Sequence, residues 1–152
     1  MSDYKRILAL VAFNSDSEAV AKRAVQLSRA YGATLALASV VDYTPGFESD
    51  HVPFLTPGEM RQAIVRDMRE KLDQMMTEIG AGGCEIIVGC GSEQEAVAEL
   101  TRSWRPDLVL VGSHARHGLE RDGVRAAYDV LTVQSKRPSF AGRMINALAA
   151  AL

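Results

Sequence analysis

Short apolar runs alternate along the chain with longer segments in which apolar residues recur every three to four positions. A continuous apolar run is typical of a strand that is covered on both faces of a sheet, and four such runs lie at 6–13, 33–41, 84–89 and 106–112. The amphipathic segments between them have the period of helices that bury one face. This alternation predicts a single α/β domain, a doubly wound parallel sheet with right-handed crossovers and helices on both faces.

Helix start signals precede three of the amphipathic segments. Each signal is a serine or threonine followed three residues later by a glutamate, which is the spacing of a capping box: Ser15 and Glu18, Thr56 and Glu59, Ser92 and Glu95. Pro57 strengthens the second start, and Gly32 follows the first segment where a helix would end. The sequence therefore predicts a helix before Gly32, a long one over 57–80 and a third one after Ser92.

The long helix carries a methionine-rich apolar stripe, which comprises Met60, Ile64, Met68, Leu72, Met75 and Ile79. Such a stripe indicates either a core-facing surface or an adaptable docking face, and the core is the more common case. Residues 119–134 also have a helical pattern and predict a fourth helix. We expect a domain over 1–142, followed by a short apolar helical tail over 143–152.

Composition narrows the functional classes. The chain is 47% hydrophobic and 24% charged, with a net charge of −2, so nothing indicates a nucleic-acid surface. No apolar run reaches the roughly 20 residues of a membrane span, and the N-terminal apolar stretch favours a first strand over a signal peptide. Cys84 and Cys90 lie in or beside one strand, where a mutual disulfide does not fit. We therefore expect a reducing, cytoplasmic setting.

Candidate chemistry gathers at strand ends, because ligands of open α/β sheets bind outside the carboxyl ends of the strands. The richest end follows the fourth strand. There Gly112 and Gly118 allow sharp turns, while Ser113, His114 and Arg116 supply hydrogen-bond donors. Together with a helix N-terminus, these groups suit an anion or a nucleotide phosphate.

At these residues the chain resembles the universal stress protein family. The segment "DLVLVGSHAR" is very near the family's usual DLIVMGSHGR, and the resemblance extends over roughly residues 4 to 131. It is similar to the A-type members. The resemblance implies a five-stranded parallel sheet in the order 3-2-1-4-5 and a regulatory or binding module of the stress response that acts as a homodimer, with a protein partner possible.

Nucleotide-binding members of this family carry G-x2-G-x9-G-S/T after the fourth strand and an aspartate at the end of the first. Here Gly112 matches the first glycine, but the second falls on Ala115, and the later pair falls on Arg125 and Ala126. The strand-1 aspartate falls on Ala12. A methyl group at 115 narrows the close approach of backbone to phosphate. This degenerate motif predicts weak or no ATP binding.

Other family positions are retained. Val40, whose counterpart contacts adenine through its backbone, is present, as are Ser113 and His114. The candidate binding residues are therefore Val40, Gly112, Ser113, His114, Arg116 and Gly118, with ATP or AMP as possible ligands. An alternative is a stress sensor whose bound nucleotide sets the dimer or partner state.

Enzymatic and metal sites are less favoured. An adenylating α/β enzyme needs an intact phosphate loop, which is not visible, and Ser113 beside His114 is not a catalytic pair by adjacency. His114 and His117 have no obvious carboxylate or thiolate partner for a metal. We therefore expect no catalytic residues and no metal site.

The C-terminus departs from the family pattern. Members usually end in a fifth strand whose edge pairs two subunits, but here Pro138 is followed by Phe140 and an interrupting Gly142. A fifth strand at this place is doubtful. The tail 143–152 must dock on its own domain or on another subunit, and both possibilities stay open.

Overall fold

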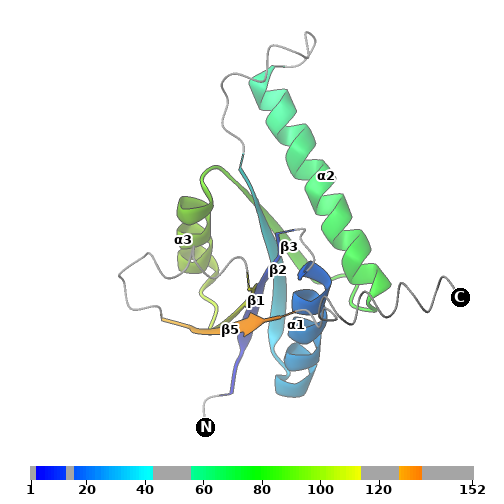
Figure 1. Cartoon of the computed structure of the whole chain (residues 1–152), viewed down its shortest axis with the longest axis vertical. Helices are drawn as coiled ribbons and strands as arrows, with labels where there is room; N and C mark the ends of the chain where they lie inside the picture. Colours follow the sequence, from blue (N-terminus) through cyan, green and yellow to red (C-terminus); the bar gives the residue numbers. More distant parts are fainter. Residues whose placement is uncertain (1–2, 13–15, 43–55, 114–126, 135–152) are drawn as a thin grey trace, which may run out of the picture.

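The computed structural model describes residues 3–12, 16–42, 56–113 and 127–134. Within these residues the chain forms a five-stranded parallel sheet in the order β3-β2-β1-β4-β5 (Figure 1). The elements are β1 Arg6–Leu10, α1 Ser17–Tyr31, β2 Thr34–Val41, α2 Pro57–Glu78, β3 Glu85–Cys90, α3 Glu93–Trp104, β4 Leu108–Gly112 and β5 Asp129–Val133. The predicted sheet and its strand order are confirmed.

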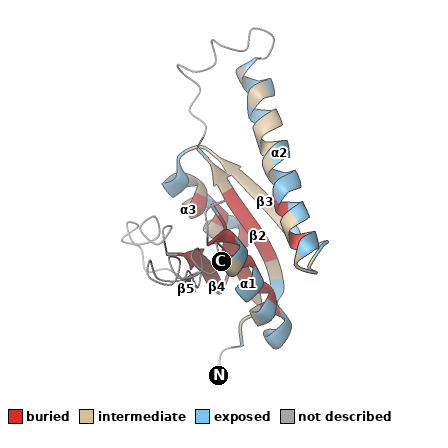
Figure 2. Ribbon diagram, turned by 45° about the vertical axis from the view of Figure 1, so that its right-hand side comes forward, coloured by how far each residue is buried: buried red, intermediate tan, exposed pale blue. Residues whose placement is uncertain are grey.

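The sheet has a hydrophobic core on each of its two faces. On one face α1 and α2 cover the side chains of alternate strand residues, among them Ile7, Leu37 and Leu110. On the other face α3 packs through Val97, Leu100 and Trp104 against the residues in between, including Leu8, Ala36 and Val109 (Figure 2). Burial on both faces explains why β1 and β4 have continuous apolar sequences rather than alternating ones.

Two of the three predicted capping signals act as expected. Thr56 forms a reciprocal capping box with Glu59, and Ser92 Oγ accepts a hydrogen bond from the Glu95 amide. The first signal was wrong: α1 begins at Ser17 with Asp16 as its N-cap, one residue later than the expected Ser15 cap. The Asp16 side chain does not cap the helix, because it is used elsewhere.

The end of α1 is as predicted. Gly32 adopts a left-handed conformation with φ of 62° and ends the helix.

The predicted helix over 119–134 is wrong for its last part, because Asp129–Val133 is strand β5. This segment, "DVLTV", is rich in β-branched residues, and it pairs in parallel with β4 along its whole length. Pairing with a neighbouring strand outweighed the local helical spacing. Tyr4 Oη donates a 2.6 Å hydrogen bond to Asp129 Oδ2 and so ties the start of β5 to the N-terminal segment.

The fifth strand was therefore sought in the wrong place. It precedes Pro138 instead of following it. The expected domain boundary at 142 and the tail 143–152 lie outside the described residues.

The stripe on α2 divides into two halves. Leu72 and Met76 are fully buried, and Met68, Met75 and Ile79 pack against the same core, which confirms a core role for the C-terminal half. By contrast Met60 and Ile64 are only half-buried and belong to neither core cluster. Figure 2 shows the first half of α2 projecting past the sheet. No described helix is long and apolar enough to cross a membrane.

Trp104, the single tryptophan of the chain, is the last residue of α3 and is buried in the core on that face of the sheet. Its ring lies under the Arg6 guanidinium at 4.0 Å, and its Nε1 donates a 3.0 Å hydrogen bond to the Glu85 carboxylate. Asp107, which follows α3, accepts hydrogen bonds from the Lys5 and Arg6 amides. These contacts join the start of β1 to the segment that enters β4.

Candidate functional site

The carboxyl ends of β1, β2 and β4 lie at one end of the sheet, on either side of the point where the strand order reverses. In the parallel register Ala9 lies between Leu37 and Leu110, so the residues that follow β1 run beside Val40 on one side and Gly112 on the other. This is the position at which doubly wound sheets bind ligands. Val40 is half-buried against the core on the α3 face, and Ala12 is exposed.

Asp16 packs directly against the end of β4. A Cβ added at Gly112 would lie 3.0 Å from the Cβ of Asp16 and 3.4 Å from its Oδ2. Contacts this short mean that any larger residue at 112 would require the N-cap residue of α1 to shift away from the strand. The space that the missing side chain leaves beside Gly112 is thus occupied by the Asp16 side chain.

The Asp16 carboxylate is held in place by Ser113, the residue that follows Gly112. Ser113 Oγ donates a 2.9 Å hydrogen bond to Asp16 Oδ2, and Asp16 as a whole is only 3% exposed. A carboxylate at a helix N-terminus also interacts favourably with the helix dipole. The Asp16 side chain therefore lies between the N-terminus of α1 and the end of β4.

Ser17, the first residue of α1, has a buried hydroxyl. Within the described part of the chain, its Oγ is the buried side-chain polar atom that lacks a hydrogen-bond partner. A buried hydroxyl without a partner is unfavourable and calls for an explanation. Ser17 follows Asp16, the N-cap residue, in the first turn of α1.

The structure brings together some of the predicted site residues. Gly112 and Ser113 meet at the end of β4, while Val40 lies at the end of β2, with β1 between them. His114, Arg116 and Gly118 lie outside the described residues, as do Ala115 and Arg125 of the phosphate motif. Their expected roles stay predictions.

Sequence reasoning missed Asp16 and Ser17. Their signal was present, because aspartate and serine are preferred N-cap residues, but the cap was assigned to Ser15. A cap assignment could not have shown that Asp16 reaches Ser113, which is 97 residues away in the chain.

Metal-ligating and redox groups are sparse in the described residues. No group of three or more His, Cys, Asp or Glu side chains there could hold a metal ion. Cys84 and Cys90 are free thiols at opposite ends of β3. Partial burial, helped by the nearby negative charge of Asp73, raises the pKa of the Cys84 thiol.

The sequence is similar to known proteins along most of its length. Residues 3–124 match the model of the Universal stress protein family. The chain is 23% identical over 121 residues to "Universal stress protein A homolog 2" of Coxiella burnetii, a match that covers 79% of this chain and 82% of the relative.

The fold is shared with solved structures of universal stress proteins. A universal stress protein family member from Burkholderia pseudomallei superposes with a TM-score of 0.65 at 22% identity, covering 89% of this chain and 99% of the other. A universal stress protein in complex with cAMP gives a TM-score of 0.60 at 21% identity, covering 88% and 98%. Because the family model spans most of the chain and the observed sheet has the matching fold, the chain belongs to the universal stress protein family.

Proposed function

We propose that this protein is a cytoplasmic regulatory module of the stress response that works by binding rather than by turnover, as a homodimer with weak or no affinity for ATP. Family membership supports the regulatory role, and the degenerate A-type motif supports weak binding of nucleotide. The proposal depends above all on the carboxylate of Asp16 at the end of β4.

The position of Asp16 opposes phosphate for two reasons. Its side chain fills the space beside Gly112 that a close approach of phosphate would need. An ionised carboxylate at this position would repel a phosphate strongly, because Asp16 is only 3% exposed and the interaction between two like charges is stronger where water is excluded. A triphosphate would have to displace the carboxylate from Ser113 or bind beside it.

Calorimetry with ATP tests this role on the native protein and on Asp16→Asn. Asparagine is an equally good N-cap residue and can still accept the Ser113 hydrogen bond, but it removes the charge. We expect at most weak binding to the native chain and a roughly tenfold or higher affinity of the variant, because the repulsion between carboxylate and phosphate is removed.

Asp73→Asn is the matched control, because Asp73 is exposed on α2 and its substitution removes the same charge away from the switch point. Tight ATP binding by the native protein would contradict the proposal. When the family residues are restored at 12, 115, 125 and 126, Asp16→Asn should still raise the affinity for ATP. An unchanged affinity would also contradict the proposal.

The second candidate function is a sensor whose bound nucleotide sets the dimer or partner state. The buried, unpartnered Ser17 hydroxyl favours it, because a nucleotide that displaced the start of α1 would supply the missing hydrogen bond. The similar fold solved in complex with cAMP also supports it. Titration with AMP and cAMP decides: micromolar binding that Ser17→Ala weakens would favour the sensor over the ATP-independent module.

The proposed homodimer is supported by the outer edge of β5. This strand lies at the end of the sheet, and its Val130 and Leu131 side chains are 43% and 38% exposed. An exposed apolar edge strand is suited to pairing with a second copy. Light scattering should show a dimer at tens of micromolar, and Val130→Lys should shift it toward monomer, because a two-fold interface would bring two new charges together.

A further inference from the structure

The opposite edge of the sheet, formed by β3, has free backbone groups. Arg69 of α2 donates a hydrogen bond to the Ile86 carbonyl from outside the sheet, whereas the Gly91 amide donates inward to Val41. The N–H and C=O groups of successive strand residues point to opposite edges of the strand. Those of Val88 and Cys90 therefore point away from β2, as those of Ile86 do. Nothing in the described part of the chain hydrogen-bonds to these outward groups.

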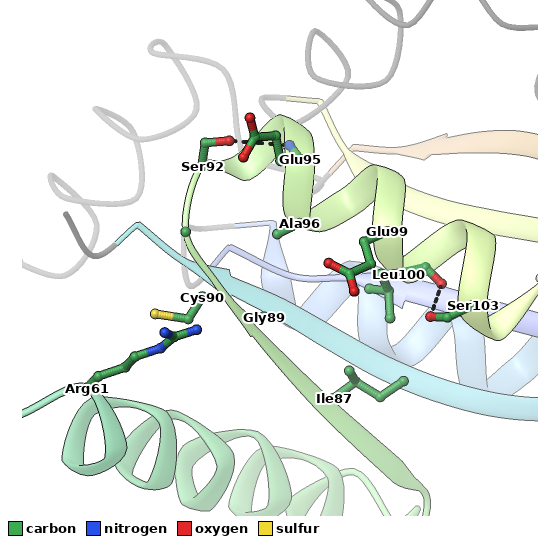
Figure 3. Close-up of a pocket in the computed structure, with 11 residues that line it drawn as sticks. Arg61, Ile87, Gly89, Cys90, Ser92, Glu95, Ala96, Glu99, Leu100 and Ser103 are labelled. Atoms are coloured by element: carbon green, nitrogen blue, oxygen red, sulfur yellow. Dashed lines mark hydrogen bonds between the residues drawn. The ribbon is translucent and has the colours of Figure 1, made fainter. Parts of the chain in front are cut away.

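A groove of about 370 Å³ lies between α3 and the part of β3 that ends at Cys90. Ile87, Gly89 and Cys90 of β3 line its floor, and the α3 side chains Glu95, Glu99 and Ser103 line one wall. Figure 3 shows Arg61 reaching toward the groove from the start of α2 on the other side. The outward backbone groups of Cys90 therefore border this groove, and Val88 lies one outward position earlier on the same edge.

The two walls carry opposite charges. Glu95 and Glu99 are exposed on consecutive turns of α3, which covers one face of the sheet. Arg61 and Arg66 are exposed on α2, which packs on the other face, and Arg66 lies with Arg61 in a second hollow on that helix. None of these four side chains forms an ion pair within the described residues.

We propose that the β3 groove binds an extended segment of a partner protein, which joins the sheet as an added strand beside Val88 and Cys90. Side chains of a strand alternate between the two faces of a sheet. An added strand would therefore direct every second residue to the acidic α3 wall and the residues between them to the basic α2 wall. The segment that fits has basic and acidic residues in strict alternation.

Each part of the groove has a separate task in this recognition. The outward N–H and C=O groups of Val88 and Cys90 supply affinity through backbone hydrogen bonds, as in other cases of strand addition. The two charged walls select the sequence and its register. Arg69 already occupies the Ile86 carbonyl and so limits the added strand to the end of β3 near Gly91.

This surface is distinct from the switch point and from the β5 edge, so it does not depend on the proposed nucleotide behaviour or on dimerisation. The probe is a synthetic peptide, acetyl-Thr-Lys-Glu-Lys-Glu-Lys-Thr-amide, titrated onto the full-length protein. We expect saturable binding that slows hydrogen exchange at the Val88 and Cys90 amides in NMR spectra. A peptide of the same composition with its charges in blocks, Thr-Lys-Lys-Lys-Glu-Glu-Thr, should bind much more weakly.

Backbone pairing is tested by methylating the peptide nitrogens of either the lysines or the glutamates. Only one of these sets can face β3, so one methylated peptide should lose binding and the other should keep it. Loss on glutamate methylation would indicate an antiparallel strand, and loss on lysine methylation a parallel one, because the two directions present different residues to the edge.

The acidic wall is tested with the double variant Glu95→Gln/Glu99→Gln. This variant should bind the alternating peptide with roughly fivefold lower affinity. The control is Glu70→Gln/Asp73→Asn, which changes the net charge equally on α2 away from the groove and should leave binding unchanged. Trp104 fluorescence shows that each variant is folded.

Three results would overturn the proposal. They are equal affinity for the alternating and blocked peptides, insensitivity to both methylation patterns, and binding without protection of the Val88 and Cys90 amides. Self-association of the native protein that is lost in Glu95→Gln/Glu99→Gln, without peptide binding, would assign the edge to a second copy of the chain instead.

Discussion

The carboxyl ends of β4 and β3 are built alike and have opposite outcomes. Each strand has a glycine at or near its end that lets the start of a helix come close: Gly112 faces Asp16 of α1, and Gly89 faces Ala96 of α3. At β4 the approaching residue is a carboxylate that bonds to Ser113. At β3 it is a methyl group, and the groove along the strand stays open.

The difference shows that the helix residue opposite the glycine, more than the glycine itself, decides how much space remains at a strand end. Glycine only removes a steric obstacle. A side chain of the right length then fills the space, as Asp16 does, while a short one leaves it available. A glycine-rich motif in the sequence therefore indicates only that space can exist at a strand end. A residue far away in the chain decides whether that space is filled.

The largest expected effect follows from adding one methyl group at β4. Gly112→Ala places a Cβ 3.0 Å from the Asp16 Cβ, whose position is set by the backbone and cannot be adjusted by rotation. Overpacking of this kind should lower the free energy of unfolding by about 2 kcal/mol. Urea denaturation followed by Trp104 fluorescence measures it, and a loss below half a kcal/mol would show that α1 moves easily.

Removing the partner of the Asp16 carboxylate should have a smaller effect. Ser113→Ala deletes the hydrogen bond at 2.9 Å but leaves the buried charge in place, so it should cost about 1 kcal/mol. The same denaturation measurement checks it, with Ser103→Ala on α3 as a matched serine control away from Asp16. If both variants lower the free energy of unfolding by the same amount, the hydrogen bond from Ser113 to Asp16 contributes no more to stability than the bond of an ordinary helical serine.

The equivalent methyl group at β3 should be nearly neutral. In Gly89→Ala the new Cβ lies 3.3 Å from the Ala96 Cβ, which requires a shift of only a few tenths of an ångström. Replacing a strand glycine also reduces the entropy lost on folding, by about 0.5–1 kcal/mol, which offsets the contact. Unfolding free energies of the Gly89 and Gly112 variants, compared directly, either separate the two strand ends or show them to be equivalent.

The smallest effect concerns the two thiols at the ends of β3. The raised pKa of Cys84 reduces its thiolate fraction at neutral pH, so iodoacetamide should modify it more slowly than Cys90, which lines the open groove. The Cys84 rate should rise as the pH approaches its pKa. Mass spectrometry of the two proteolytic peptides that contain Cys84 and Cys90 measures both rates. Faster labelling of Cys84 would mean that the groove beside Cys90 is closed to the reagent.

The order of strands and helices was readable in the sequence because each element there has a local cause. Continuous apolar runs predicted β1, β2, β3 and β4, and the Thr56 and Ser92 caps located α2 and α3. β5 was missed, since its residues also allow a helical pattern and only pairing with β4 selects the strand. Local patterns cannot report the energy of a contact with a distant strand.

At the candidate site the sequence by itself determined which groups were available: Gly112, Ser113 and Val40 follow or end predicted strands. Only the tertiary structure decided their use, because the crossing of α1 over the sheet brings Asp16 onto Gly112. Within the described residues it also left the outward backbone groups of Val88 and Cys90 without partners, since β3 became an outer strand. Strand order and helix approach depend on the packing of the whole sheet, and no segment of the chain encodes them alone.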